Sequence, residues 1–213
     1  YVRGFSADLG ADNKQGTSDD TFYKFEKKDE NGQTVIDWDL QVEGVTSAEF
    51  KYQRHRWQWM EPQAKTYRVT KNEEYIKNWI ETYQSWMAAY PCPNAKFDDN
   101  ETDKNSNYQW KGLQTAERLL SQLNVMQYYL QSTNFTPEWL STFLISIADH
   151  VEMIRKNYYQ TPGDNIRLSQ IQAVFTAGVL MPEFKNAAEW TNEASTILDT
   201  EIGSQFLEDG VHA

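Results

Sequence analysis

The sequence contains a single cysteine, Cys92, so no disulfide can form within the chain. One cysteine is compatible with a reducing compartment, or with export that needs no covalent staple. Cys92 lies in a short Tyr-Pro-Cys-Pro loop with no histidine near it in the sequence. A thiol becomes a nucleophile when a base or positive charge lowers its pKa. The sequence therefore favours a buried small side chain over a catalytic thiol.

Long apolar runs are also absent. No stretch approaches the roughly 20 residues that a helix needs to span a bilayer, so we expect no membrane segment. No signal peptide is present, and neither Tyr1 nor Ala213 resembles a natural terminus. We therefore expect the chain to be part of a longer protein.

The chain has fewer basic than acidic residues. It has 20 Lys and Arg against 31 Asp and Glu, a net charge of −11 at pH 7. Nucleic-acid binding needs a basic surface, so we expect no nucleic-acid partner. The chain also has no phosphate loop, dinucleotide fingerprint, zinc spacing or nucleophile elbow, and its three histidines are too scattered to indicate a metal site. We predict no metal or cofactor.

Aromatic residues are abundant, at 14% of the chain with eight Trp. Such rings fit a large helical core, and their flat faces would also fit the apolar faces of sugars. For any single ring we favour the core, because aromatic side chains generally dominate core energetics.

Residues 1–45 are polar and rich in turn residues, and no helical period runs through them. Up to residue 50 the chain carries eleven acidic and five basic side chains. We predict an irregular, acidic N-terminal extension over 1–45. Residues 34–38 would form a short strand, or an extended segment laid on the following domain.

Helical signals begin at residue 46. Thr46 and Thr70 each precede a Glu by three residues, which is a capping-box pattern. Pro62 should kink or end the first helix, and Thr136 followed by Pro137 is a strong helix start. Behind these signals apolar residues recur every three or four positions. We predict an all-α domain over 46–213, with six or so helices that stack as a ring or a solenoid. No fixed sequence repeat is present, which favours the ring.

Three places could carry chemistry. The first runs from Tyr52 to Trp59 and holds two Arg, one His and two Trp. Arg could grip an acidic sugar while Trp stacks on it, and a core helix with Arg heads reaching solvent is an equal alternative. The second is Asn165 at a helix start, where Asp164 or Asn165 could be an N-cap, or the amide could bind a carboxylate. The third is Tyr108 and Trp110, with Leu113 and Arg118 behind them. The Tyr and the Trp could line a cleft or staple the start of the next helix.

The order of these motifs resembles a known family. The resemblance covers about 160 residues and includes the segments Gln-Arg-His-Arg-Trp at 53–57, Trp-x-x-Leu at 110–113, Phe-Thr-Pro at 135–137 and Pro-Glu-Phe-Lys at 182–185. It continues through the Thr-Glu-Ile segment at 200–202 to Asp209 and Gly210. On these residues the chain resembles the heparinase II/III-like polysaccharide lyases, and among them the heparinase III (heparan-sulfate lyase) group.

This resemblance implies an incomplete (α/α) toroid, of which residues 46–213 would be the N-terminal part, followed by a C-terminal β-sandwich. It implies β-elimination at a uronic acid: an amide neutralises the carboxylate, a base removes the C5 proton, and an acid protonates the leaving glycosidic oxygen. Asn165 matches the catalytic amide, although Ile166 stands where the family often has His. By position, the candidate substrate-binding residues are Gln53, Arg54, His55, Arg56 and Trp110.

The family's catalytic Tyr and His would lie beyond Ala213, so we expect the isolated chain to be inactive. The resemblance also implies an acidic polysaccharide partner, a periplasmic or secreted bacterial location and no cofactor, although some relatives use a structural divalent ion. Residues 51–90 carry seven basic and four acidic side chains, which favours a weakly sulfated or purely uronic glycan. Alternatives are an alginate or other uronate lyase, a non-catalytic glycan-binding toroid, and a helical scaffold without a sugar role.

Overall fold

The computed structural model describes residues 4–8, 18, 21–93, 108–159 and 165–211. The described chain is mostly helical, as predicted. Its α-helices are α1 (Ala48–Arg56), α2 (Glu61–Thr70), α3 (Glu74–Ala89), α4 (Gly112–Tyr129), α5 (Pro137–Lys156), α6 (Asn165–Leu180) and α7 (Ala187–Gln205). Two short 3₁₀ helices, η1 (Gln58–Met60) and η2 (Tyr108–Trp110), precede α2 and α4.

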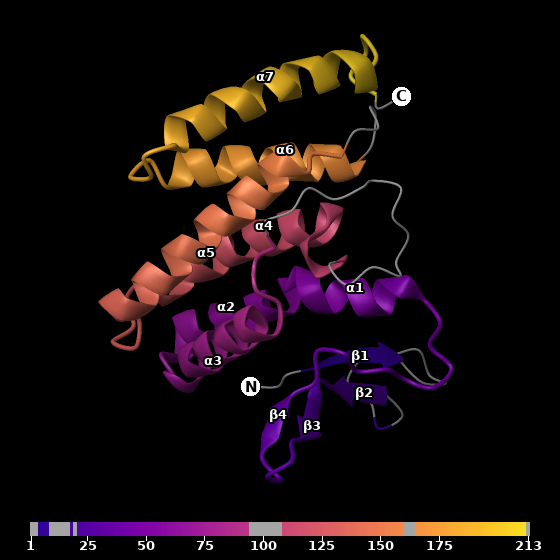
Figure 1. Ribbon diagram of the computed structural model, residues 1–213, viewed down its shortest axis with the longest axis vertical. Helices are drawn as coiled ribbons and strands as arrows, with labels where there is room; N and C mark the ends of the chain where they lie inside the picture. Colours follow the sequence, from indigo (N-terminus) through magenta and orange to yellow (C-terminus); the bar gives the residue numbers. More distant parts are fainter. Residues whose placement is uncertain (1–3, 9–17, 19–20, 94–107, 160–164, 212–213) are drawn as a thin grey trace.

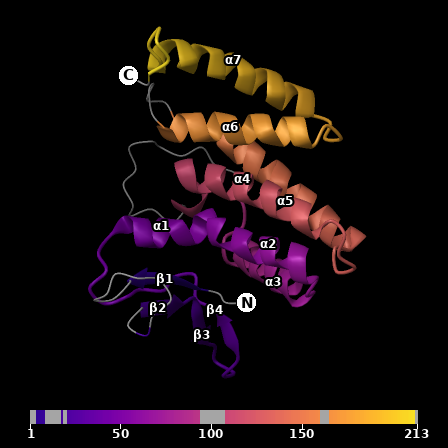
Figure 2. The same ribbon diagram turned by 180° about the vertical axis from the view of Figure 1, so that it is seen from behind.

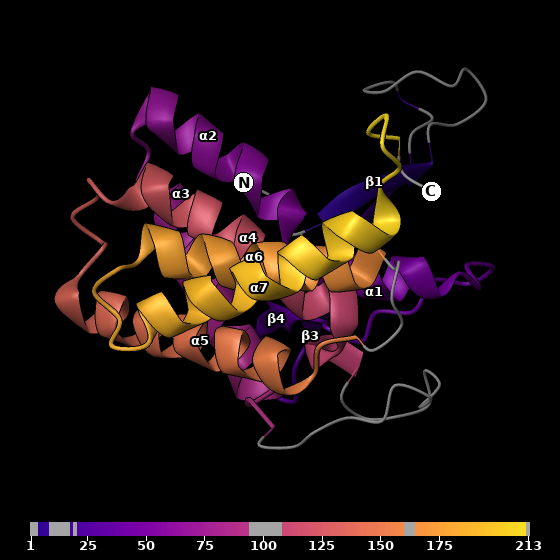
Figure 3. The ribbon, with the colours of Figure 1, turned by 90° about the horizontal axis from the view of Figure 1, so that it is seen from above.

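The elements stack along the long axis of the molecule (Figure 1). Two β-hairpins lie at one end, α1 to α3 follow, α4 and α5 form the middle, and α6 and α7 lie at the other end. Figure 2 shows the same order from behind. In the view from above, α7 lies over α6 (Figure 3), and the two helices are in direct contact.

The prediction of an irregular N-terminal extension is wrong for much of this segment. Strand β1 (Gly4–Asp8) pairs antiparallel with β2 (Thr21–Lys24), and β3 (Glu26–Lys28) pairs with β4 (Thr34–Ile36). The second hairpin closes through Asp29, whose carboxylate accepts from the backbone N–H groups of Asn31 and Gln33 at 2.9 and 2.8 Å. The strand predicted within 34–38 is confirmed at β4.

Residues 25–40 also pack onto the helices. Phe25, Ile36 and Trp38 are buried, and the indole N–H of Trp38 donates to Ser85 on α3 at 3.1 Å. This segment is therefore part of the core.

Helix α1 ends earlier than predicted, and for a different reason. Trp57 follows it in the left-handed conformation, with φ of 63°. This conformation is strained for a residue other than glycine. Complete burial of the indole offsets the strain here. Pro62 then lies in the first turn of α2. It starts a helix, because the N–H that proline lacks has no intrahelical partner in a first turn.

The predicted caps differ in outcome. Thr136 caps α5 as predicted, accepting from the N–H of Trp139 at 3.2 Å. At α1 the cap is Ser47 and not Thr46. Thr70 is the last residue of α2, and Asn72 accepts from the first turn of α3 at 3.0 Å.

The core is aromatic. Seven of the eight Trp are buried, which decides for the core and against exposed stacking platforms at those positions. The inner face of α3 supplies Trp79, Tyr83 and Trp86. Their rings contact Trp57, Tyr129, Trp139 and Phe143 at centroid distances of 4.8 to 5.6 Å.

Candidate functional site

The centre of the helical layers is organised by Arg118 on α4, whose side chain is completely buried. Its Nη1 donates to the carbonyl oxygens of His55 and Gln109 at 2.8 and 3.0 Å. Its Nε donates to Nε2 of His150 at 2.8 Å. The guanidinium also lies 4.0 Å from the ring centroid of Trp86. Arg118 thus joins the end of α1, η2 and α5 at one point.

Hydrogen bonds fix the proton on each of the two buried histidines. Trp86 donates to Nδ1 of His55 at 3.0 Å, so Nε2 of His55 carries the proton and donates to the hydroxyl of Tyr108 at 3.2 Å. Nδ1 of His150 donates to the carbonyl of Ser146 at 2.6 Å, which leaves Nε2 free to accept from Arg118. Both rings are therefore neutral.

Burial also favours the neutral form of both histidines. Burial, with Arg118 and Arg54 close by, lowers the pKa of His55 to about 2. Burial and Arg118 hold the pKa of His150 well below its ordinary value. Burial also lowers the pKa of Arg118 to about 9, which leaves the guanidinium charged at neutral pH. One cation bonded to a neutral imidazole and to backbone carbonyls is suited to fixing a scaffold.

The α1 residues predicted to bind substrate lie in different environments. Arg54 is buried and donates to the carbonyls of Trp38 and Leu40 at 2.5 and 2.6 Å. Arg56 is nearly buried, pairs with Glu49 at 2.9 Å and donates to Gln114 at 3.2 Å. Gln53 alone of the four is exposed. The helix therefore turns His55 and the two Arg toward the fold and Gln53 toward solvent.

Trp110 is buried at the end of η2. Its indole N–H donates to the carbonyl of Tyr90 at 3.1 Å, and its ring lies 4.7 Å from that of His150. It connects η2 to the end of α3 and to α5. Arg54, His55 and Trp110 are buried and make internal hydrogen bonds, although Nε of Arg54 has no partner among the described residues. Substrate contact by the predicted set stays a prediction.

Asn165 is the first residue of α6 and its side chain is exposed. Asp164, the other candidate N-cap, lies outside the described residues. The start of α6 rests on the start of α4, because a Cβ added to Gly112 would lie 3.3 Å from Cγ2 of Ile166. Gly112 has φ of +45°, which favours glycine. The amide of Asn165 is thus held at the positive end of a helix, where a carboxylate binds favourably.

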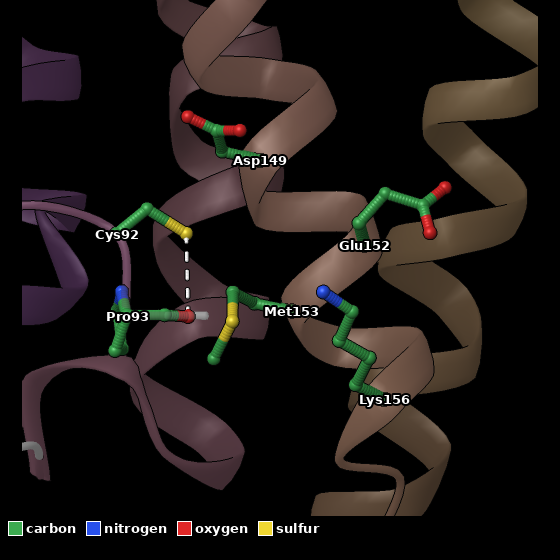
Figure 4. Close-up of a pocket in the computed structure, with 6 residues that line it drawn as sticks. All are labelled: Cys92, Pro93, Asp149, Glu152, Met153 and Lys156. Atoms are coloured by element: carbon green, nitrogen blue, oxygen red, sulfur yellow. Dashed lines mark hydrogen bonds between the residues drawn. The ribbon is translucent and has the colours of Figure 1, made fainter. Parts of the chain in front are cut away.

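A pocket of about 220 Å³ lies between the loop after α3 and the second half of α5 (Figure 4). Cys92, Pro93, Asp149, Glu152, Met153 and Lys156 line it. Burial and the charge of Asp149 raise the pKa of the Cys92 thiol to about 11. The thiol is protonated at neutral pH and is a poor nucleophile, as the sequence predicted. With two carboxylates against one ammonium, the pocket is also unsuited to an anionic sugar.

Within the described ranges, no three His, Cys, Asp or Glu side chains come together as metal ligands would. No helix in the same ranges combines the length and apolarity needed to cross a bilayer.

The sequence analysis named Tyr108 as a cleft or staple residue and Arg118 beside it, but it predicted for neither residue the buried hydrogen bonds found here. Arg118 lies among apolar helix positions, and nothing in the sequence distinguishes a buried arginine from one at the surface. Tyr108 accepts from His55, 53 residues away. The one available signal was the number of polar residues on the apolar face of α4, where Gln114, Thr115, Arg118, Ser121 and Gln122 are all buried.

The fold and the site define a class: a helical scaffold that buries a hydrogen-bonded arginine and presents an exposed amide at a helix start. Comparison with known proteins specifies it further. The model of the heparinase II/III N-terminal region matches residues 7–213. The chain therefore belongs to the heparinase II/III family, through its N-terminal region.

Individual relatives agree. A heparin-sulfate lyase of Bacteroides thetaiotaomicron is 42% identical over 177 residues, 83% of this chain and 24% of that protein. A heparin-sulfate lyase of Pedobacter heparinus is 29% identical over 176 residues, again 83% of this chain and 25% of that protein. The chain thus spans about a quarter of the length of these lyases.

Solved structures also agree. A crystal structure of heparinase III superimposes with a TM-score of 0.75 at 40% identity, over 89% of this chain and 27% of that one. A heparan sulfate lyase of Pedobacter heparinus superimposes with a TM-score of 0.74 at 26% identity, over 99% of this chain and 29% of that one.

Proposed function

We propose that the complete gene product is a polysaccharide lyase that cleaves a heparan sulfate-like glycosaminoglycan by β-elimination. In this proposal the chain is the first part of an (α/α) toroid, which later segments complete together with a C-terminal β-sandwich. The observation that carries the proposal is the exposed amide of Asn165 at the start of α6, in a chain that belongs to the heparinase II/III family.

Asn165 would act on the uronate carboxylate. Its amide N–H donates to a carboxylate oxygen, and the positive end of α6 adds to the attraction. Withdrawing charge from the carboxylate makes the C5 proton more acidic and stabilises the negative charge that develops as this proton leaves. The electron pair of the C5–H bond then forms the C4–C5 double bond. The C4–O bond breaks, and the leaving oxygen takes a proton.

The residues around Arg118 would act indirectly. Arg118 and His55 hold η2 against α1. Gly112, which follows η2, packs against Ile166 and so joins the start of α4 to the start of α6. Arg54 and Trp110 fix neighbouring segments through backbone carbonyls. We propose that these residues position the cleft. Gln53, which is exposed, is proposed to contact the polysaccharide directly.

The relatives are heparin-sulfate lyases, which favours heparan sulfate over alginate as the substrate. We also propose that the protein acts in the periplasm or outside the cell, where it would encounter such polysaccharides. Cell fractionation with an antibody to this chain tests the location, and a purely cytosolic signal would refute it.

The experiment uses the complete gene product and its Asn165→Ala variant, with Asn192→Ala on the exposed face of α7 as the matched control. Each is incubated with heparan sulfate, heparin, hyaluronan, chondroitin and alginate while the ultraviolet absorbance of unsaturated uronate is followed. We expect turnover of heparan sulfate, a loss of about 100-fold or more in Asn165→Ala, and no loss in Asn192→Ala. No absorbance rise with any glycan would sink the lyase proposal.

A further inference from the structure

A second pocket, of about 330 Å³, lies between the last turns of α2 and α4. Its lining is entirely polar or aromatic and contains no carboxylate: Arg68, Lys71, Asn124, Gln127, Tyr128 and Gln131. In a chain with a net charge of −11 such a lining is unusual. We propose that this pocket binds an acidic saccharide unit, one that carries a carboxylate or a sulfate.

The two cations are available to a ligand. Neither Arg68 nor Lys71 has a carboxylate partner in the described part of the chain, and the Lys71 ammonium lies 5.4 Å from the ring centroid of Tyr67. Both side chains are exposed. Glu73 is close in sequence, but its carboxylate accepts hydrogen bonds from Tyr67, Ser132 and Asn134. A guanidinium and an ammonium that are not neutralised can bind a carboxylate or a sulfate through charge-assisted hydrogen bonds.

The other lining residues suit a sugar. Asn124, Gln127 and Gln131 each carry an amide that both donates and accepts, as sugar hydroxyls require. Tyr128 offers an aromatic ring and a hydroxyl. Positive charge, amides and one ring in one hollow thus match a sugar with an anionic substituent better than a bare inorganic anion.

The pocket lies far from the proposed catalytic amide. Asn165 is beside the first turn of α4, through the contact of Ile166 with Gly112. Asn124 follows Gly112 by twelve residues on the same helix, which is about 18 Å along its axis. The pocket would therefore hold a different part of a long polysaccharide, or a separate chain.

This inference rests on the proposed function only in the choice of an acidic polysaccharide as ligand. Its test is binding and not cleavage, so the two can fail separately. The complete gene product carries Asn165→Ala throughout to prevent turnover. Surface plasmon resonance measures its affinity for immobilised heparan sulfate and for neutral dextran.

Three variants are compared on that background. Arg68→Ala with Lys71→Ala removes both cations of the pocket. Asn124→Ala alters the pocket without changing charge. Lys24→Ala with Lys185→Ala is the matched control, because it removes two exposed cations elsewhere.

We expect the double pocket variant to lose about tenfold or more in affinity, the order of one charge-assisted hydrogen bond. Asn124→Ala should lose severalfold, the control pair should stay within about twofold, and dextran should not bind. Equal losses in the two double variants, or an unchanged affinity in Asn124→Ala, would show diffuse charge attraction and overturn the proposal. So would a double pocket variant that unfolds more easily but binds as before, since its cations would then only complement the helix ends.

Discussion

At the scale of single residues, Arg118 is a cation held wholly inside the described fold. It is completely buried, and its partners in the described residues are carbonyls, a neutral imidazole and aromatic faces. Burying a charge is costly unless its donors find partners. Here Nε and Nη1 are satisfied, whereas Nη2 has no hydrogen-bond partner in the described part of the chain. Removing the group would leave buried acceptors without a donor. The site therefore depends on this side chain even though it reaches no solvent.

Replacing Arg118 by Met tests this dependence. The change leaves the His55 and Gln109 carbonyls and the Nε2 of His150 without their donor. We expect a loss of about 3 kcal/mol in the free energy of unfolding, measured by urea denaturation. Arg68→Met, at an exposed arginine, should change it by about 0.5 kcal/mol or less. Similar losses in both variants would contradict the role given to Arg118.

The buried histidines predict a dependence of stability on pH. Both have pKa values in the folded protein below the ordinary value, about 2 for His55. Below about pH 6.5 the unfolded chain binds protons that the folded protein does not. Their contribution is therefore complete above the unfolded pKa and is lost as pH falls from 6.5 toward 2.

The measurement is the urea midpoint between pH 7.5 and 5.5, where most carboxylates stay ionised. Each histidine should contribute up to about 1.4 kcal/mol of lost stability per pH unit below 6.5. His150→Gln should halve the slope. A midpoint that does not move over this range would mean that the two rings are accessible to protons in the folded protein.

At the scale of elements, α6 and α7 show how closely the layers approach. A Cβ on Gly178 would lie 2.8 Å from the Ala187 carbonyl and 3.1 Å from the Thr191 amide nitrogen, and would also meet the Thr191 hydroxyl. Backbone atoms cannot move aside as the end of a flexible side chain can. Gly178 is therefore required for the contact between these two helices.

Two glycine substitutions separate packing from helix propensity. Gly178→Ala should destabilise the protein by about 1–3 kcal/mol, because α6 and α7 must move apart. Gly203→Ala lies in α7 with nothing near the added carbon, and should stabilise by about 1 kcal/mol through helix propensity alone. Thermal unfolding of each variant shows whether its stability falls or rises. Stabilisation by both substitutions would show that the two helices do not pack as described.

At the scale of the whole molecule, Asn165 is the one described residue to which the proposed mechanism assigns a chemical role. The chain spans about a quarter of the related lyases. The proposed mechanism also needs a base that removes the C5 proton and an acid that protonates the leaving oxygen. It assigns neither role to a described residue of this chain. The chain alone should therefore position a uronate without cleaving it.

Incubation of the isolated chain with heparan sulfate tests this expectation. We expect no rise in ultraviolet absorbance, against a clear rise with the complete gene product at the same concentration. The fluorescence of the isolated chain serves as the control for folding, because its buried Trp should emit at shorter wavelength than in urea. Turnover by the isolated chain would refute the expectation and place an acid and a base within it.

The sequence by itself determined the helical class, most helix positions and the cap at Thr136, because apolar spacing and cap chemistry are local. It also indicated Asn165, through motif order along the chain. Only the tertiary structure decided that Arg54 and His55 point inward and Gln53 outward, that Pro62 starts a helix, and that residues 25–40 join the core. These outcomes depend on contacts between residues far apart in the chain, such as Arg118 with His55 and Trp38 with Ser85. No local pattern encodes which of several polar side chains on a helix will find a buried partner.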